Sequence, residues 1–345
     1  GSLTLTNGAV FRCTGEMQVA DKLNMNYYPI FPDPTNVTAI INVPEGCTLY
    51  AQAITFGNGT NMVNGGMTSV LNQAGTVITT GRAAEDNGIR LGHYPQAYST
   101  YNMMGGVLEV RADWDLCCAT DGQGWFRQTG GEVFAKRVML NERGGNGGYG
   151  RLSVSGGVLN IGSMTGSMLA LSNGITADPG APYLVELGGA GGTIRAVTNV
   201  TVAVSNTLYG AAASAVTFDT AGWDIVLSGN SIGAGGLNKS GAGVLTLSGT
   251  NTYSGATRVL GGSLTPAWAG ALPAGGEVQF GVASDDSGGR LYAAGDLPLN
   301  GIVVGVANPD DLDESKSYTI ATYGGAITGS IAGDTLPGPW YVYYD

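Results

Sequence analysis

The sequence predicts an all-β fold, a parallel β-solenoid with about 25 residues per coil. Two observations carry this prediction. Short runs of alternating apolar and polar residues are separated by glycine-rich turns, and a segment built around a Gly-Gly pair recurs at a nearly constant interval. The glycine-rich stretch 235–264 shows no apolar period of an amphipathic helix. A chain that turns this often without helices must wind its strands around a shared core.

The composition agrees with a solenoid and excludes other classes. The 345 residues include 59 glycines, and 43% of residues are hydrophobic while 12% are charged, which is too apolar for a disordered polar chain. The net charge is −11 and the basic residues do not cluster, which argues against nucleic acid as a partner. No apolar run approaches the roughly 20 residues of a spanning helix, so we expect no membrane insertion of this segment.

The clearest repeat lies between residues 71 and 172. Gly-Gly pairs begin at positions 105, 130 and 156, so the interval is 25 or 26 residues. The aligned segments are Tyr101–Val110, Phe126–Ala135 and Leu152–Ile161, and Leu71–Thr80 is a weaker copy. This interval suits one coil of three short strands with its corners, whereas the Leu/Asn consensus of leucine-rich repeats is absent.

Each glycine pair is predicted to form a corner of the coil, because glycine permits positive φ and close approach of two backbones. The second position after each of these three pairs is apolar, and we expect Leu108, Val133 and Leu159 to point inward and stack on one another. The predicted corner residues are Gly105, Gly106, Gly130, Gly131, Gly156, Gly157, Gly261 and Gly262.

The chain is expected to be one continuous solenoid in three parts. Residues 1–70 form irregular coils, in which the segment 24–36, with three prolines and three aromatic residues, is a protruding loop or a cap. Residues 71–265 form the regular solenoid. Residues 266–345 are less regular, and Trp340–Tyr344 is expected to be a closing strand.

Residues 235–264 hold two or three short strands joined by glycine turns. This stretch resembles the passenger-associated repeat of bacterial autotransporters over about a tenth of the chain. The resemblance implies a right-handed parallel β-helix exported to the cell surface or the extracellular space, with a signal peptide that lies outside this sequence. The matching residues are Gly235, Gly236, Leu237, Lys239, Ser240, Gly241, Gly243, Leu245, Leu247, Ser248, Gly249, Asn251, Tyr253, Ser254, Gly255, Thr257, Val259, Gly262 and Leu264.

The four cysteines are too few for a disulfide scaffold. Cys13 and Cys47 are 34 residues apart, which fits neighbouring coils, and they are the disulfide candidates of an exported chain. Cys117 and Cys118 are adjacent on a predicted strand and point to opposite faces, so one of them is expected in the core. A bridge between these two neighbours is the alternative.

No convincing catalytic or metal-binding constellation appears in the sequence. Asp113 and Asp115 would share one face of a strand, as Ca²⁺ binding or glycosidic acid–base chemistry requires, but a solvated strand edge is the favoured interpretation. Asp310, Asp311 and Asp313 are weak Ca²⁺ candidates in a charged loop that lacks the spacing of an EF-hand. No other cofactor is expected.

Side chains for other chemistry are sparse. His93 is the single histidine, so a Ser-His-Asp or Cys-His site must use it, and its place before Tyr94 and Pro95 favours a loop position. Some aromatic residues are candidates for stacking on sugars, although structural stacking is favoured for them. These residues are Tyr27, Tyr28, Tyr94, Tyr98, Tyr101, Trp114 and Trp125.

Without a catalytic constellation, the sequence favours a non-enzymatic, exported structural or adhesive protein of the cell surface. Unpaired backbone on terminal coils predicts self-association, end to end or side by side, into a fibre or layer. Two alternatives remain open. One is a module that binds a glycan or a host surface, and the other is a polysaccharide lyase or hydrolase that uses Asp113 and Asp115.

Overall fold

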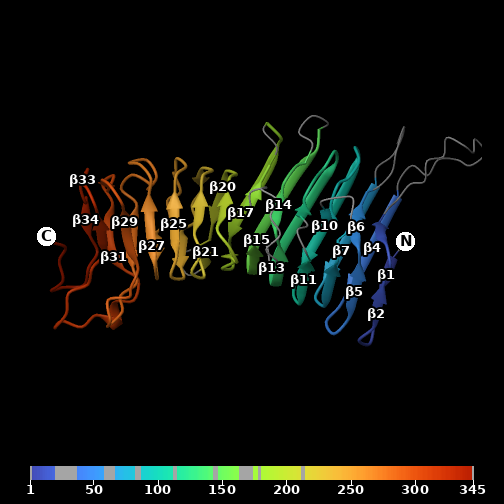
Figure 1. Ribbon diagram of the computed structural model, residues 1–345, viewed down its shortest axis with the longest axis horizontal. Helices are drawn as coiled ribbons and strands as arrows, with labels where there is room; N and C mark the ends of the chain where they lie inside the picture. The colour runs from blue at the N-terminus through green and yellow to red at the C-terminus, as the bar shows by residue number, and fades with distance from the viewer. Residues whose placement is uncertain are drawn as a thin grey trace, which may run out of the picture. The chain divides into compact units, whose positions relative to one another are not determined.

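The computed structural model describes residues 2–19, 37–57, 67–81, 87–111, 115–142, 147–162, 174–177, 180–210 and 214–343. The chain divides into two compact units, Gly1–Val185 and Glu186–Asp345, and each is described by itself. Each strand pairs in parallel with a strand of the next coil, which confirms the predicted parallel β-helix, a β-solenoid (Figure 1).

In the first unit, most coils contribute three strands, and each strand pairs with its counterpart one coil further on. The first two strands of a coil belong to one sheet and the third belongs to the other. The first row is β1 (Ser2–Thr4), β4 (Val37–Val43), β7 (Met67–Gln73), β10 (Ala97–Met103), β13 (Gln123–Ala135) and β15 (Tyr149–Ile161). The second row is β2 (Val10–Arg12), β5 (Thr48–Ala51), β8 (Thr76–Thr79), β11 (Val107–Val110) and the later parts of β13 and β15. The third row is β3 (Glu16–Val19), β6 (Ala53–Phe56), β9 (Asn87–Arg90), β12 (Asp115–Cys117), β14 (Arg137–Met139) and β16 (Gly174–Thr176).

The second unit repeats this plan with shorter strands. Its first row is β17 (Tyr183–Gly188), which begins in the first unit, β20 (Asn206–Tyr209) and β23 (Ser231–Ile232). The second row is β18 (Thr193–Ala196), β21 (Val216–Asp219), β24 (Leu237–Ser240), β26 (Thr257–Val259), β28 (Glu277–Phe280), β31 (Val303–Val306) and β34 (Gly333–Asp334). The third row is β19 (Val200–Val202), β22 (Ile225–Leu227), β25 (Val244–Leu247), β27 (Ser263–Pro266), β29 (Arg290–Ala293) and β32 (Ala321–Tyr323). A small separate pair is β30 (Leu297–Pro298) with β33 (Ile327–Thr328), and a 3-10 helix covers Pro309–Asp311.

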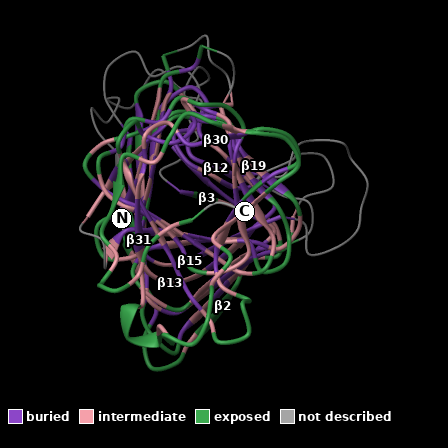
Figure 2. Cartoon of the chain, turned by 90° about the vertical axis from the view of Figure 1, so that its left-hand side faces the viewer, coloured by how far each residue is buried: buried purple, intermediate pink, exposed green. Residues whose placement is uncertain are grey.

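The core lies inside the coils, and Figure 2 marks the buried residues of the strands that enclose it. The inward residues of neighbouring strands, such as those of β11, β13 and β15, pair in register from one coil to the next. Leu108 pairs in register with Val133, and Val133 with Leu159. All three side chains are buried, which confirms their predicted inward stacking. Each such side chain contributes about 1.5–3 kcal/mol of transfer free energy. Repetition of this stack therefore stabilises a chain with few charges.

The length of a coil varies more than the sequence repeat indicates. The interval is 25 residues between Leu108 and Val133, as predicted. It is 31 between Val77 and Leu108 and only 20 between Leu237 and Thr257. The interval between Val77 and Leu108 includes the seven-residue β10, whereas the interval between Leu237 and Thr257 has no strand of the first row, so the shorter coil has lost a strand.

Two sequence-based expectations concern the ends of the chain. Residues 340–343 are not a strand, so the predicted closing strand Trp340–Tyr344 is wrong over its described part. Tyr341 and Tyr343 are mostly exposed, so their alternation with Val342 does not reflect one buried face. The predicted loop or cap at 24–36 lies outside the described residues. Among the residues that are described, no helix is long and apolar enough to cross a membrane.

Candidate binding face and corner network

The outward face of β10, β13 and β15 in the first unit gathers aromatic and polar side chains. Because the strands pair in register, the outward residues form three rows across the coils. The rows are Tyr98–Gln123–Tyr149, Thr100–Trp125–Arg151 and Asn102–Arg127–Ser153. We call these nine residues the binding face.

Alternation along the strands fixes which side chains reach this face. The intervening residues Tyr101, Phe126 and Leu152 are fully buried. The rings of Tyr101 and Phe126 have centroids 5.2 Å apart. Burial raises the pKa of Tyr101 well above its usual value, so its hydroxyl stays neutral and donates to Gln73 Oε1 at 2.5 Å. A packed core thus holds the outward side chains in position.

Two arginines lie against the ring of Trp125. The guanidinium carbon of Arg151, on the next coil, is 4.1 Å from the ring centroid, and that of Arg127, on the same strand, is 4.5 Å away. Cation–π contact of this kind fixes a guanidinium and leaves its N–H edge free to donate.

A ladder of asparagines borders the binding face. Asn102 donates from Nδ2 to Asn72 Oδ1 at 2.9 Å, and Asn72 donates to Asn42 Oδ1 at the same distance. Asn42 in turn donates to Thr4 Oγ1 at 2.9 Å. Identical amides in register satisfy one another along the coils and present a polar stripe on the outside.

The predicted corner glycines lie on top of one another in the first unit. The second glycine of each pair has a positive φ: 70° at Gly106, 69° at Gly131 and 70° at Gly157. A Cβ on Gly131 would lie 2.7 Å from the backbone oxygen of Gly106, and one on Gly157 would lie 2.3 Å from that of Gly131. In the second unit, Gly262 has a φ of 63° and approaches Gly241 in the same way.

Buried amides hold two of these corners. Gln73 donates from Nε2 to the carbonyls of Gly75 at 3.0 Å and Val107 at 2.7 Å. Gln128 repeats this arrangement with the carbonyls of Gly131 at 3.3 Å and Val158 at 3.0 Å. Each glutamine therefore joins its own corner to the next coil. The sequence analysis did not identify them, although both stand two residues before a corner glycine.

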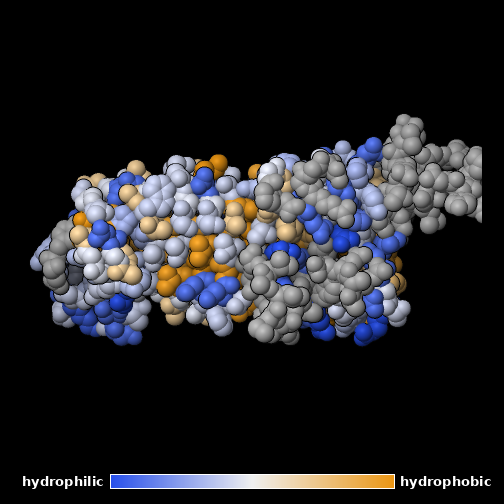
Figure 3. Space-filling view, turned by 45° about the horizontal axis from the view of Figure 1, so that its top comes forward, coloured by the Kyte–Doolittle hydropathy of each residue, from blue (hydrophilic) through white to orange (hydrophobic). Residues whose placement is uncertain are grey.

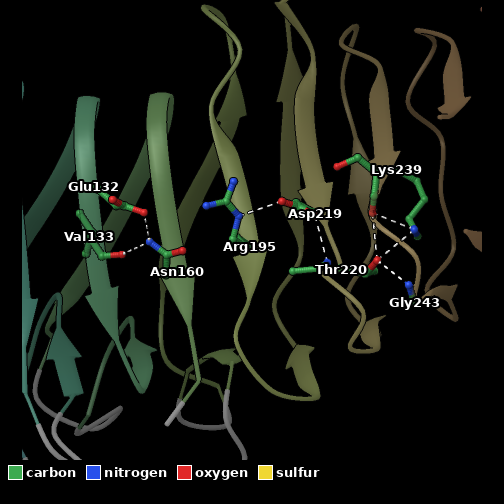
Figure 4. A network of polar contacts seen from close by, with 10 residues as sticks. Glu132, Val133, Asn160, Arg195, Asp219, Thr220, Lys239 and Gly243 are labelled. Atoms are coloured by element: carbon green, nitrogen blue, oxygen red, sulfur yellow. Dashed lines mark hydrogen bonds and ion pairs between the residues drawn. The ribbon is translucent and has the colours of Figure 1, made fainter. Parts of the chain in front are cut away.

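In the second unit, Lys239 has the same role with a charge (Figure 4). Its buried Nζ donates to the carbonyls of Ser240, Gly241 and Gly261 at 2.8, 2.7 and 2.9 Å, and to Thr220 Oγ1 at 3.1 Å. Burial lowers the pKa of Lys239 to about 8, and the charges of Asp219 and Asp224 act in the opposite direction.

Two further contacts in Figure 4 link neighbouring strands within a unit. In the second unit, Arg195 donates from Nε to Asp219 Oδ2 at 2.8 Å between β18 and β21. In the first unit, Asn160 donates from Nδ2 to Glu132 Oε1 and to the carbonyl of Val133, both at 3.1 Å. These polar side chains hydrogen-bond to one another or to the backbone between neighbouring strands, so we assign them a structural role.

The paired acids at 113 and 115 do not form the predicted arrangement. Asp113 lies outside the described residues. Asp115 is buried and forms an ion pair with Arg137 on the next strand, so it is not on a solvated strand edge. Its carboxylate is engaged with a guanidinium rather than placed in a groove.

The candidate Ca²⁺ loop does not gather its carboxylates. Asp310 and Asp311 belong to the 3-10 helix, where Asp311 accepts from Asn308 Nδ2 at 2.5 Å. Asp313 accepts from the Ser315 amide and hydroxyl at 3.0 and 2.7 Å. Within the described residues, no group of three or more His, Cys, Asp and Glu side chains is arranged to hold a metal ion.

The remaining candidates have structural surroundings. The ring of His93 packs edge-on against Tyr94 with centroids 4.5 Å apart. Of the aromatic candidates, Tyr101 is fully buried, Tyr98 is 51% exposed and Trp125 is partly buried. Tyr27, Tyr28 and Trp114 lie outside the described residues.

All four cysteines are free thiols, so the structure corrects the predicted Cys13–Cys47 disulfide. Arg12 pairs with Tyr50 and Val10 with Thr48, which puts Cys47 four positions before the residue opposite Cys13. Four residues of strand span about 13 Å, which is too far for a disulfide. Cys117 and Cys118 are both buried, whereas one of them was expected in the core.

A cavity of about 790 Å³ lies in the second unit. Core residues such as Phe280, Leu291 and Val304 line it, and Tyr318 and Trp340 stack beside it with ring centroids 5.8 Å apart. Figure 3 also shows hydrophobic side chains among polar ones over the strands between β17 and β27. The exposed large apolar residues of this unit include Trp223, Ile232, Leu260 and Trp268.

Comparison with known proteins agrees with the resemblance of the glycine-rich stretch. Residues 237–265 match the family model of the passenger-associated-transport repeat. Over 144 residues, which are 42% of this chain, the sequence is 31% identical to the adhesin BmaC autotransporter of Brucella suis biovar 1 (strain 1330). The match spans 4% of that relative's length. No solved structure matches the chain. The residues that match the passenger-associated-transport repeat, 237–265, contain the buried Lys239 and the corner at Gly262 and lie on the parallel β-helix.

Proposed function

We propose that this chain is a non-enzymatic adhesive segment of an exported, autotransporter-type protein. The observation that carries the proposal is the passenger-associated-transport repeat at residues 237–265. The similarity to a protein named an adhesin supports the adhesive part of the proposal. The segment then acts at the cell surface or in the extracellular space.

The binding face on β10, β13 and β15 is the part of the molecule that we assign to adhesion. Its residues alternate with the core, so a partner can contact them without disturbing the coils. The polar groups at the corners, by contrast, are buried in contacts within the fold. Binding at a glycan or a host surface is therefore proposed for this face alone.

Polysaccharide degradation gains no support from Asp115, because that carboxylate is paired with Arg137. Self-association into a fibre or layer stays a prediction from the sequence.

Adhesion is tested by binding of the purified, fluorescently labelled chain to mammalian cells in flow cytometry. We expect saturable binding that an excess of unlabelled chain displaces. A heat-unfolded sample of the same chain is the control for non-specific attachment. Binding that fails to saturate, or that equals the unfolded control, contradicts the proposed function.

A further inference from the structure

Trp125 and its two arginines form a positively charged cluster on the binding face. The guanidinium carbons of Arg127 and Arg151 lie 4.5 and 4.1 Å from one ring centroid, so they are within about 9 Å of each other. Two like charges this close repel one another, and an anion that accepts from both guanidinium groups relieves the repulsion.

Neither arginine is neutralised by the described part of the protein. In that part, Arg127 and Arg151 have no carboxylate within ion-pair distance, whereas Arg137 and Arg195 each have one. Arg151 Nε and Trp125 Nε1 are also buried N–H groups without a hydrogen-bond partner there. Buried donors without partners are rare in folded proteins. In a chain of net charge −11, two unpaired arginines side by side point to a ligand.

The surroundings of the arginines indicate what the rest of the ligand is. Tyr98 is 51% exposed and Gln123 is exposed in the adjoining row. Tyrosine rings stack on the apolar faces of sugars, and amides bond to their hydroxyl groups. A planar guanidinium fork fits a carboxylate with two parallel hydrogen bonds.

We propose that the binding face recognises a carboxylated glycan, with the carboxylate on Arg127 and Arg151 and a sugar ring against Tyr98. This inference rests on the proposed adhesive function and names its ligand class. Trp125 holds the two guanidinium groups in place, so it is a positioning residue.

The probe is a galacturonate oligosaccharide, and its methyl ester is the uncharged control. Calorimetry with the full chain should show binding of the acid form and none of the ester. Arg127→Gln and Arg151→Gln should each weaken binding about tenfold or more, as expected for loss of a charged hydrogen bond. Arg12→Gln is the matched control, because Arg12 also stacks on an aromatic ring, at 3.9 Å from the centroid of Tyr50.

Equal binding of acid and ester, or equal affinities of the Arg127, Arg151 and Arg12 variants, overturns the proposal. Unchanged unfolding temperatures of the variants show that the loss is local. Tighter binding of a sulfated than of a carboxylated oligosaccharide also overturns it. If the wild-type chain binds cells but not the oligosaccharide, the adhesive function stands and this inference fails.

Discussion

Lys239 is a charged residue that the passenger repeat buries at a corner. Its ammonium group donates to three carbonyls and one hydroxyl from three stretches of chain. Removal of the side chain takes a donor from the Gly241 and Gly261 carbonyls, whereas Ser240 O and Thr220 Oγ1 still accept from the amides of Thr220 and Gly243. A buried acceptor left unsatisfied costs about 1–3 kcal/mol. Lys239, which matches the repeat motif in the sequence, thus joins neighbouring coils through the hydrogen bonds of its ammonium group.

Lys239→Met should lower the free energy of unfolding by about 1–3 kcal/mol at pH 7. The folded pKa of about 8 lies below the usual 10.5, so the unfolded chain binds more protons between these values. The lysine's contribution to stability therefore rises as the pH increases through this range. Urea unfolding of both proteins at pH 7.5 and 9.5 should show a larger deficit of the variant at pH 9.5. A deficit that shrinks with pH contradicts the assigned surroundings.

The thiols provide a second test at this scale. Cys47, Cys117 and Cys118 are buried, and burial raises the pKa of Cys117 to about 12, so these thiols should not react in the folded protein. Cys13 is partly exposed. A chromogenic disulfide reagent should therefore detect one thiol in the native chain and all four after denaturation. If Cys13 and Cys47 were bridged, the native chain would show none and the denatured chain two.

At the scale of the element, the glycine corner sets the register between the strands of one coil and those of the next. β13 and β15 each run through a glycine pair and continue into the next row. The register shifts at this point, between Gln128 and Glu132. The second glycine of each pair has a left-handed backbone and lies against the corner of the neighbouring coil. Glycine meets both requirements because it has no Cβ.

Gly131→Ala should destabilise the chain by about 1–3 kcal/mol, because its φ of 69° is strained for alanine and the new Cβ meets the Gly106 carbonyl. Gly15→Ala is the control, since its φ is not positive and no atom lies within 4 Å of the added Cβ. Thermal unfolding followed by circular dichroism measures both. Equal melting temperatures for the two variants would show that the corner imposes no such constraint.

The repeat at residues 105–157 was sufficient to predict the strands and the stacked core, because inward residues recur at a fixed offset from each glycine pair. Leu108, Val133 and Leu159 show this directly. The Cys13–Cys47 pair failed because chain separation measures which coils are neighbours but not the register between them. Trp340–Tyr344 failed because alternation alone does not reveal whether a preceding strand is available to pair.

The binding face could be predicted only in part. Trp125 was a candidate by residue type, but the arginines were not, since Arg151 follows it by a full coil and meets it only through the register. Gln73 and Gln128 were missed because a buried glutamine has the same sequence appearance as an exposed one. A polar residue at an inward position two places before a corner glycine is the signal that would have found them.

At the scale of the whole molecule, stability and recognition depend on different residues. The stacked core residues, the corner glycines and the buried Gln73, Gln128 and Lys239 stabilise the coils. The outward rows of β10, β13 and β15 remain available to a partner. Substitutions on the binding face should therefore change adhesion without changing the unfolding temperature.

The assignment of adhesion to the binding face is tested most directly by counting beads that adhere to mammalian cells. The beads are coated with the wild-type chain or with the double variant Arg127→Gln/Arg151→Gln. Beads coated with Arg12→Gln at equal density are the control. We expect the double variant to retain no more than about a tenth of wild-type adhesion, as for loss of two charged contacts, while Arg12→Gln adheres as the wild type does. Equal adhesion of the wild type and the double variant would contradict the assignment of adhesion to this face.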